Sequence, residues 1–193
     1  MKKLLLTGFE PFLEFPVNPT TDITNELHQN VIGDFEITGE ILTVDFQKTG
    51  TQLVDLIKKH QPDAIVSLGL AAGRNCITPE RIAINCNDGP EDNHGHKPDG
   101  EKIFEDGPVG YFSRLPIKAM AESLQEAGFP ASISNTAGTY LCNHVMYYGL
   151  HHFDGPAGFI HMPASHKLAV AKKMPSWSHA DLLQAVKISI QCL

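Results

Sequence analysis

The amino-acid sequence predicts an α/β fold, with an open, mostly parallel, twisted sheet and helices on both of its faces. Short apolar runs suited to buried strands alternate along the chain with amphipathic helical patterns, as in doubly wound proteins. The length of 193 residues and an apolar fraction of 42% suit one compact domain, which we expect to span residues 1–193. Functional sites in such sheets form at the carboxyl ends of the strands.

The expected strands are short runs rich in Leu, Ile, Val or Phe, several of them bounded by Gly or Pro. They cover residues 3–7, 36–44, 63–70, 131–134 and 157–161. Helical patterns lie between and after them, at residues 19–29, 46–60, 116–127, 142–151 and 178–191. Asn18 is expected to cap the first helix. Residues 85–110 are crowded with Gly, Pro, Asp and Asn, which predicts a long loop of the kind that is commonly functional or mobile.

The charge of the chain argues against some classes of partner. Fifteen Lys and Arg against 22 Asp and Glu give a net charge of 15 − 22 = −7, so nucleic acid is not an expected partner. The first apolar run breaks at Thr7-Gly8, too early for a signal peptide, and no run approaches the roughly 20 residues needed to cross a bilayer. We therefore expect a soluble, cytoplasmic protein without membrane contact.

Four cysteines, at positions 76, 86, 142 and 192, include no Cys-x-x-Cys pair. This excludes a zinc knuckle and a dithiol redox motif, so free thiols are expected. The histidines are scattered over loop, helix and strand, which makes a metal site the weaker alternative. No Walker pattern or Gly-x-Gly-x-x-Gly follows the first strand, and we expect neither a metal nor a cofactor.

Cys142 is the cysteine whose position points to chemistry. It follows a turn of small residues and opens the amphipathic segment that starts at Asn143. A thiol near a helix N-terminus is stabilised as thiolate by the unpaired N–H groups and the helix dipole, so a lowered pKa and a nucleophile are expected. From position alone, a buried structural cysteine is about equally plausible.

A cysteine nucleophile needs an imidazole partner, and His161 is the best placed of ten histidines. It ends an apolar strand at the expected carboxyl edge of the sheet, whereas His144 lies two residues beyond Cys142 on the same helix and faces elsewhere. A satisfied core histidine is the alternative. Glu80, beyond the strand that ends at Leu70, is the candidate to orient the imidazole, and its alternative role is an ion pair with a neighbouring arginine.

These residues lie in segments that resemble the pyrrolidone carboxyl peptidases, also called pyroglutamyl peptidase I. The matching segments are residues 7–12 with Asn18-Pro19, 73–85, 135–144 and 158–163, in family order and spanning nearly the whole chain. Any one match would be weak, but four in order are specific. The resemblance identifies residues 1–193 as a single catalytic domain.

The resemblance implies a cysteine peptidase that hydrolyses the bond after an N-terminal pyroglutamyl residue through a thioester acyl-enzyme. It implies that Cys142 is the nucleophile, His161 the general acid and base, and Glu80 the orienting carboxylate. It also implies a homo-oligomer, a dimer or a tetramer. The substrate-binding residues implied by it are Phe9, Phe12, Asn18, Leu70 and Leu141. A flat, neutral lactam suits an apolar slot, whereas free glutamate would have to bury a charge.

The chain departs from the family pattern at two places. Many relatives carry an arginine in the loop after Asn85, but residues 86–93 contain none. Leu70 stands where glutamine is frequent, although a main-chain contact there would survive the change. Two further alternatives are a nucleoside phosphorylase or amidotransferase on the same fold, and a binding protein that has lost catalysis.

Overall fold

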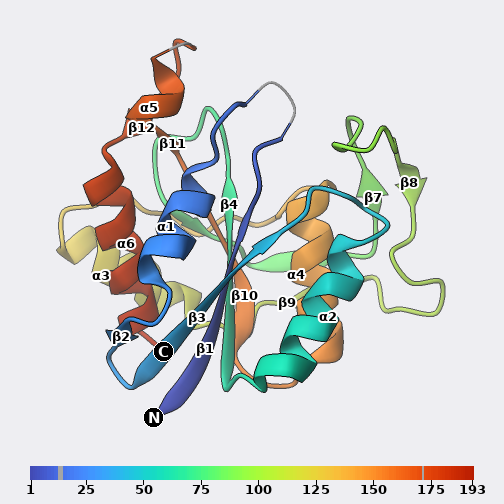
Figure 1. The fold of residues 1–193 in the computed structure, drawn as a ribbon, viewed down its shortest axis with the longest axis horizontal. Coiled ribbons are helices and arrows are strands. Elements are labelled where there is room, and N and C mark those ends of the chain that lie inside the picture. Colours follow the sequence, from blue (N-terminus) through green and yellow to red (C-terminus); the bar gives the residue numbers. More distant parts are fainter. Residues whose placement is uncertain (13–14, 171) are drawn as a thin grey trace.

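The computed structural model of the protein describes residues 1–12, 15–170 and 172–193. Its centre is a six-stranded sheet in the order β2-β3-β1-β4-β10-β5 (Figure 1). These strands are β1 (Lys2–Phe9), β2 (Val31–Ile32), β3 (Phe35–Leu42), β4 (Ala64–Leu70), β5 (Thr78–Pro79) and β10 (Ala157–Met162). The four inner strands run parallel and the two edge strands pair antiparallel. The predicted α/β fold with a mostly parallel sheet is confirmed.

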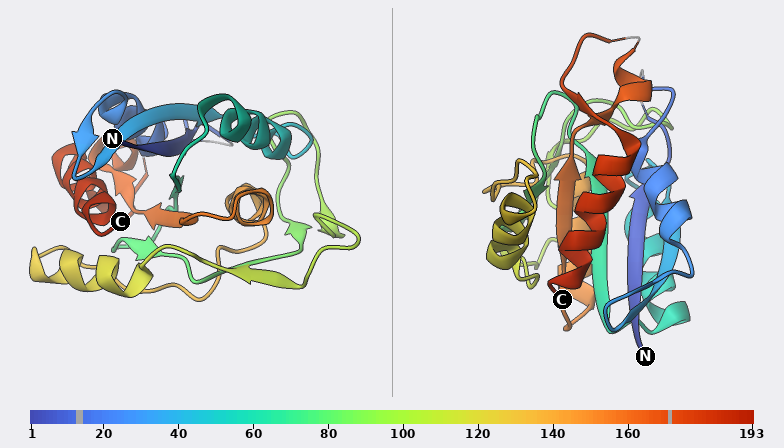
Figure 2. Two further views of the ribbon diagram at one scale, coloured as in Figure 1. Left: turned by 90° about the horizontal axis from the view of Figure 1, so that it is seen from below. Right: turned by 90° about the vertical axis from the view of Figure 1, so that its left-hand side faces the viewer.

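Helices cover both faces of this sheet (Figures 1 and 2). They are α1 (Pro19–Leu27), α2 (Thr49–His60), α3 (Ile117–Glu126), α4 (Leu141–His152), α5 (His166–Ala169) and α6 (His179–Gln191). Helices α1, α3 and α6 enclose one apolar core, and α2 and α4 enclose the other. Alternate residues of β1 supply the two cores, because Leu4 and Leu6 face the first and Leu5 faces the second.

Three pairs of short strands lie outside the main sheet. They are β6 (Ile82–Ile84) with β9 (Gly110–Phe112), β7 (Asn87–Asp88) with β8 (Asp99–Glu101), and β11 (Ala164–Ser165) with β12 (Ser176–Trp177). The predicted long loop, residues 85–110, thus contains β7 and β8 and extends to the side of α2 and α4 (Figure 1). We call residues 85–109 the excursion.

The predicted strand at residues 131–134 is wrong. This segment forms only isolated bridges, Ala131 with Ile77 and Ser134 with Glu80. The backbone bonds Ile77 N–H to Pro130 O and Ser134 N–H to Pro79 O are present, at 3.0 Å each. Proline has no N–H to donate, so Pro79 interrupts the ladder between these two points.

Helix boundaries differ from the prediction by a few residues. The helix expected from residue 46 begins at Thr49, and the helix expected to end at residue 29 ends at Leu27, since Gln29 has a left-handed backbone with φ 64°. Asn18 does cap α1, where its Oδ1 accepts the N–H of Thr20, and Pro19 occupies the first helical position. The short helix α5 has no counterpart among the predicted helices.

The layers position the carboxyl ends of β1, β4 and β10 at one edge of the sheet. Every residue of β4 is buried, as expected for a strand with helices on both faces. In the parallel register, His161 of β10 pairs with Gly69 of β4. Phe9 and Leu70 end their strands, and His161 is the last residue but one of β10, so the three lie at the same edge of the sheet.

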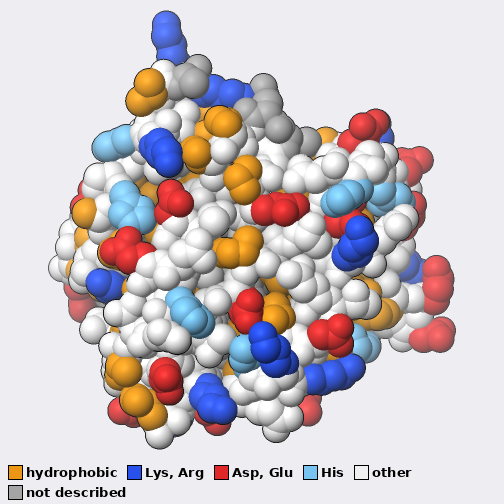
Figure 3. All heavy atoms as spheres, in the orientation of Figure 1, with side chains coloured by type: hydrophobic (Ala, Val, Ile, Leu, Met, Phe, Trp, Pro, Cys, Tyr) orange, Lys and Arg blue, Asp and Glu red, His pale blue; other side chains and the backbone are white. Residues whose placement is uncertain are grey.

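The surface carries mixed charges. Figure 3 shows acidic and basic side chains interspersed over the face it draws, among the residues that the structure describes. Within residues 1–12, 15–170 and 172–193, no helix combines the length and the apolar content that a membrane span needs.

Candidate active site

The sulfur of Cys142 lies in the first turn of α4, packed against the end of β4. Tyr140 precedes this helix in an extended conformation, so the chain turns into the helix directly before the cysteine. A β-carbon placed on Gly69 would lie 3.0 Å from the Cys142 Sγ atom and 2.5 Å from the Phe159 ring. Only glycine therefore allows the sulfur and the ring to approach β4 this closely.

His161 and Glu80 form a buried hydrogen-bonded pair. The imidazole Nδ1 lies 2.7 Å from the Glu80 Oε1 atom, and the two residues are 5% and 0% exposed. Strand β5 creates this contact, because it pairs antiparallel with β10 and brings residue 80 beside residue 161. With Nδ1–H donated to the carboxylate, Nε2 is the nitrogen that can accept a proton.

Glu80 also forms the ion pair with a neighbouring arginine that was its alternative role in the sequence. Arg74 Nη1 donates to the same Oε1 atom over 2.8 Å and also to the Thr78 hydroxyl, whereas Arg81 Nε donates to the Asn135 side chain over 2.8 Å. One carboxylate thus binds both the imidazole and a guanidinium. The two roles that appeared as alternatives in the sequence are therefore combined in the fold.

Burial sets the proton affinities of the imidazole and the carboxylate. Burial lowers the pKa of His161, the bond and charge of Glu80 partly oppose this, and the nearby Arg74 charge adds to the decrease. Burial by itself would raise the pKa of Glu80, but its hydrogen bonds to His161 and Arg74 outweigh burial and the net pKa is lowered. Glu80 is therefore ionised and His161 neutral near pH 7.

The expected low pKa of Cys142 is wrong. Burial, and after it the Glu80 charge, raise the pKa of this thiol to about 12, although Arg74 acts in the opposite direction. The helix N-terminus does not outweigh the loss of solvent around the sulfur. The resting site is accordingly a neutral thiol beside a neutral imidazole, and any attack by the sulfur must transfer its proton as it proceeds.

An apolar pocket opens above Cys142. Its atom-free volume, including the open mouth, is about 260 Å³. The lining residues are Phe9, Phe12, Asn18, Val44, Leu70, Tyr140, Leu141 and Cys142. All five residues predicted to bind substrate lie here, together with the predicted nucleophile. The Asn18 side chain is occupied by its cap bonds to Thr20 and by a 3.2 Å bond to Glu10 O, so it supports the wall of the pocket.

Three residues of this site were not predicted from the sequence. Val44 and Tyr140 line the pocket, and Gly69 permits the close approach of the sulfur. Tyr140 could have been noted, since it directly precedes the helix of Cys142. Val44 could also have been noted, since it ends the strand predicted at residues 36–44, although β3 itself ends at Leu42.

The remaining cysteines and histidines bear on the metal and disulfide alternatives. All four cysteines are free. In the described part of the chain, no group of three or more His, Cys, Asp or Glu side chains converges as metal ligands would.

A cysteine at a helix start beside a histidine–carboxylate pair, on an α/β sheet, is the arrangement typical of cysteine-dependent hydrolases. Comparison with known proteins gives the family. A family model described as pyroglutamyl peptidase matches residues 2–193, and the chain belongs to this family. The resemblance stated from the sequence motifs is confirmed.

Two curated relatives are both named pyrrolidone-carboxylate peptidase. The protein of Oceanobacillus iheyensis is 61% identical, covering 100% of each chain, and that of Halalkalibacterium halodurans is 49% identical, covering 97% of each. Among solved structures, pyrrolidone carboxyl peptidase from Thermococcus litoralis superposes with a TM-score of 0.95 at 36% identity, covering 100% of this chain and 93% of the other. Pyroglutamyl peptidase I from Bacillus amyloliquefaciens superposes with a TM-score of 0.95 at 40% identity, covering 100% of this chain and 96% of the other.

Proposed function

We propose that this protein removes N-terminal pyroglutamyl residues from peptides, with Cys142 as nucleophile, His161 as general acid and base, and Glu80 as the orienting carboxylate. One observation carries the proposal: His161, which forms a buried hydrogen bond with Glu80, pairs in the sheet with Gly69, and the sulfur of Cys142, a residue of the apolar pocket, packs against Gly69. Membership of the pyroglutamyl peptidase family supports the reaction class.

The raised pKa of Cys142 and the neutral state of His161 suggest how the reaction begins. The thiol proton moves to the imidazole Nε2 as the sulfur attacks the pyroglutamyl carbonyl carbon. N–H groups in the first turn of α4, which have no helical acceptors, are oriented to stabilise the developing oxyanion. His161 then protonates the amine, which leaves, and a thioester to Cys142 remains.

Water completes the cycle. His161 accepts a proton from water as it attacks the thioester carbonyl, and free pyroglutamate and the thiol are released. Glu80 keeps the imidazole in the tautomer that both steps require and stabilises the positive charge that the ring carries within each of them. The same carboxylate remains ionised throughout because Arg74 also donates to it.

The pocket accounts for the choice of substrate. A lactam ring is flat and uncharged, so walls such as Phe9, Phe12 and Leu70 can enclose it without leaving a charge unpaired. An N-terminal ammonium group would lose its hydration in the same place. We propose peptides that begin with pyroglutamate as the substrates.

The testing experiment is turnover of a pyroglutamyl-linked chromogenic amide by the wild type beside Cys142→Ser and His161→Ala. We expect both variants to lose activity while keeping the far-UV circular dichroism of the wild type, because a hydroxyl is far less acidic than a thiol and an amine leaves poorly without a proton. Normal turnover by either variant would contradict the mechanism.

We also propose that the protein is cytoplasmic and forms a homo-oligomer, a dimer or a tetramer. The four free cysteines support a reducing compartment. Val109 and Phe112 are three residues apart and are 91% and 67% exposed, so they offer apolar surface that a second copy could cover. Cell fractionation and sedimentation velocity test these two proposals.

A further inference from the structure

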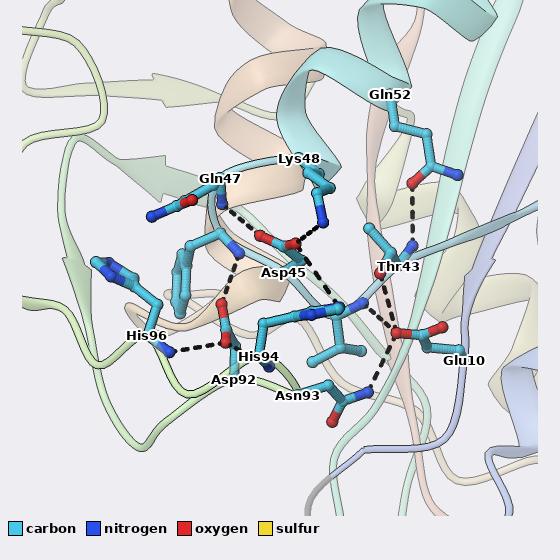
Figure 4. A network of polar contacts seen from close by, with 12 residues as sticks. Glu10, Thr43, Asp45, Gln47, Lys48, Gln52, Asp92, Asn93, His94 and His96 are labelled. Carbon is cyan, nitrogen blue, oxygen red and sulfur yellow. Dashed lines mark hydrogen bonds and ion pairs between the residues drawn. The ribbon is translucent and has the colours of Figure 1, made fainter.

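Two walls of the pocket are connected by one carboxylate outside it. Phe9 and Phe12 line one wall, and Glu10 lies between them in the chain. The Glu10 Oε1 atom accepts hydrogen bonds from Thr43 Oγ1 at 3.0 Å, from the Val44 N–H at 2.8 Å and from Asn93 Nδ2 at 3.1 Å (Figure 4). Val44, which follows the neighbouring strand β3, also lines the pocket. Glu10 therefore links two segments of the chain that each supply a wall of the pocket.

Asn93, from the excursion, strengthens the same link. Its Nδ2 donates to Pro11 O over 2.9 Å as well as to Glu10, and its backbone N–H donates to Val44 O over 3.1 Å. One asparagine thus contacts the backbone of both wall segments. This gives the excursion a position beside the pocket that the sequence did not indicate.

Neighbouring contacts hold Asn93 in place. Asp92, which is 6% exposed, accepts the Phe46 N–H over 2.9 Å and closes its own turn by accepting the N–H groups of His94 and His96 (Figure 4). The Phe46 ring meets the ring of the pocket residue Tyr140 edge-on, with centroids 5.2 Å apart. The excursion is therefore fastened to the pocket at several points.

We propose that Glu10 and Asn93 form a clasp that sets the separation of the pocket walls and thereby the affinity for the lactam ring. Both act as positioning residues, because neither lines the pocket. The proposal rests on the proposed function, since it concerns the same pocket and the same substrate ring.

Packing physics explains why a small change in wall separation matters. The lactam is small and uncharged, so close contact with apolar walls supplies much of its binding. A gap of about 0.5–1 Å forfeits roughly a quarter to a half of the attraction between two surfaces. The clasp bonds to Glu10 are charge-assisted, which makes them stronger than bonds between neutral groups. Asn93 is exposed and Glu10 is partly exposed. The substitutions below keep an oxygen at position 10 that can accept the N–H of the buried Val44.

The decisive variant is Asn93→Asp, which has nearly the same shape but loses both side-chain donors and places a second carboxylate against Glu10. We expect the KM for a pyroglutamyl amide to rise about tenfold, with kcat within about twofold of the wild type, because binding is lost equally in the ground and transition states. The inhibition constant of 2-pyrrolidone, which is the lactam ring alone, should rise by the same factor.

The double variant Glu10→Gln with Asn93→Asp removes the repulsion between two carboxylates. It also restores a hydrogen bond, because the amide at position 10 can donate to the carboxylate at position 93. We expect its KM to lie below that of Asn93→Asp alone, a coupling that a purely structural defect would not produce. Glu105→Gln, which removes a charge from an 87% exposed side chain of the excursion, is the control and should keep the wild-type KM. Should Asn93→Asp fail to fold, Asn93→Ala and Glu10→Gln and their double variant provide the same test.

The outcomes separate this proposal from the proposed function. A wild type that does not cleave the amide contradicts the function itself. If the wild type is active and the KM of the clasp variants is unchanged, the clasp proposal is overturned. A loss in the variants that is confined to kcat overturns it as well. Strictly additive KM effects in the double variant would also overturn it, because a clasp requires the two residues to act on each other.

Discussion

Gly69→Ala tests the packing beneath the nucleophile. Its β-carbon would lie 2.5 and 2.7 Å from two atoms of the Phe159 ring and 3.0 Å from the Cys142 Sγ atom. Carbon atoms in contact normally lie about 3.5–4.0 Å apart, so the ring must move by about 1 Å. The Phe159 and His161 ring centroids are 4.9 Å apart, so this movement reaches both reacting side chains.

We expect Gly69→Ala to lower kcat/KM for a pyroglutamyl amide by about a hundredfold, the usual consequence of a misplacement near 1 Å. Overpacking should also cost about 1–3 kcal/mol of unfolding free energy, measured by urea titration. Assays are run where circular dichroism shows the variant to be folded, so that instability does not count as lost catalysis.

Gly149→Ala in α4 is the matched control. Its β-carbon would lie 3.5 Å from a methyl carbon of Leu53, an ordinary contact, and alanine favours a helix interior over glycine by roughly 0.5–1 kcal/mol. This variant should keep full activity. The reasoning is refuted if Gly69→Ala retains wild-type kcat/KM, because the sulfur and the ring would then not depend on the missing side chain.

Three further predictions concern proton affinity and selectivity. Burial lowers the pKa of His144 to about 4, so the unfolded chain binds a proton there more readily than the folded chain. The free energy of unfolding should therefore fall as the pH drops below the ordinary histidine pKa near 6.5, by about 2 kcal/mol between pH 7 and 5. Urea titrations of His144→Gln should show a weaker dependence of this free energy on pH. Arg74 lowers the pKa of His161, so Arg74→Met should move the acid limb of the kcat/KM profile to higher pH; an unmoved limb would mean that this charge does not act on the imidazole. Peptides that begin with proline or glutamine would bring a charged amine into an apolar pocket. We expect them to be cut on the order of a thousandfold more slowly than pyroglutamyl peptides. Comparable rates would indicate a broader aminopeptidase.

Local patterns in the chain were enough to predict the layers of the fold and the candidate catalytic residues. The apolar run that became β4 and the Asn18-Pro19 start of α1 are local signals, because burial pattern and capping depend on residues close together in the chain. The placement of Cys142 at a helix start and of His161 at a strand end followed from the same kind of signal. Motif matches in order then identified the family.

How these groups affect one another depends on contacts between distant parts of the chain. Solvent exclusion around Cys142 comes from packing against β4 and raises its pKa, so the helix-terminus rule predicted the wrong direction. The antiparallel pairing of β5 with β10 gave Glu80 two partners at once, and the absent N–H of Pro79 interrupted the expected strand at residues 131–134. Burial, strand pairing and contacts across the chain depend on residues distant in sequence, which is why local patterns could not determine them.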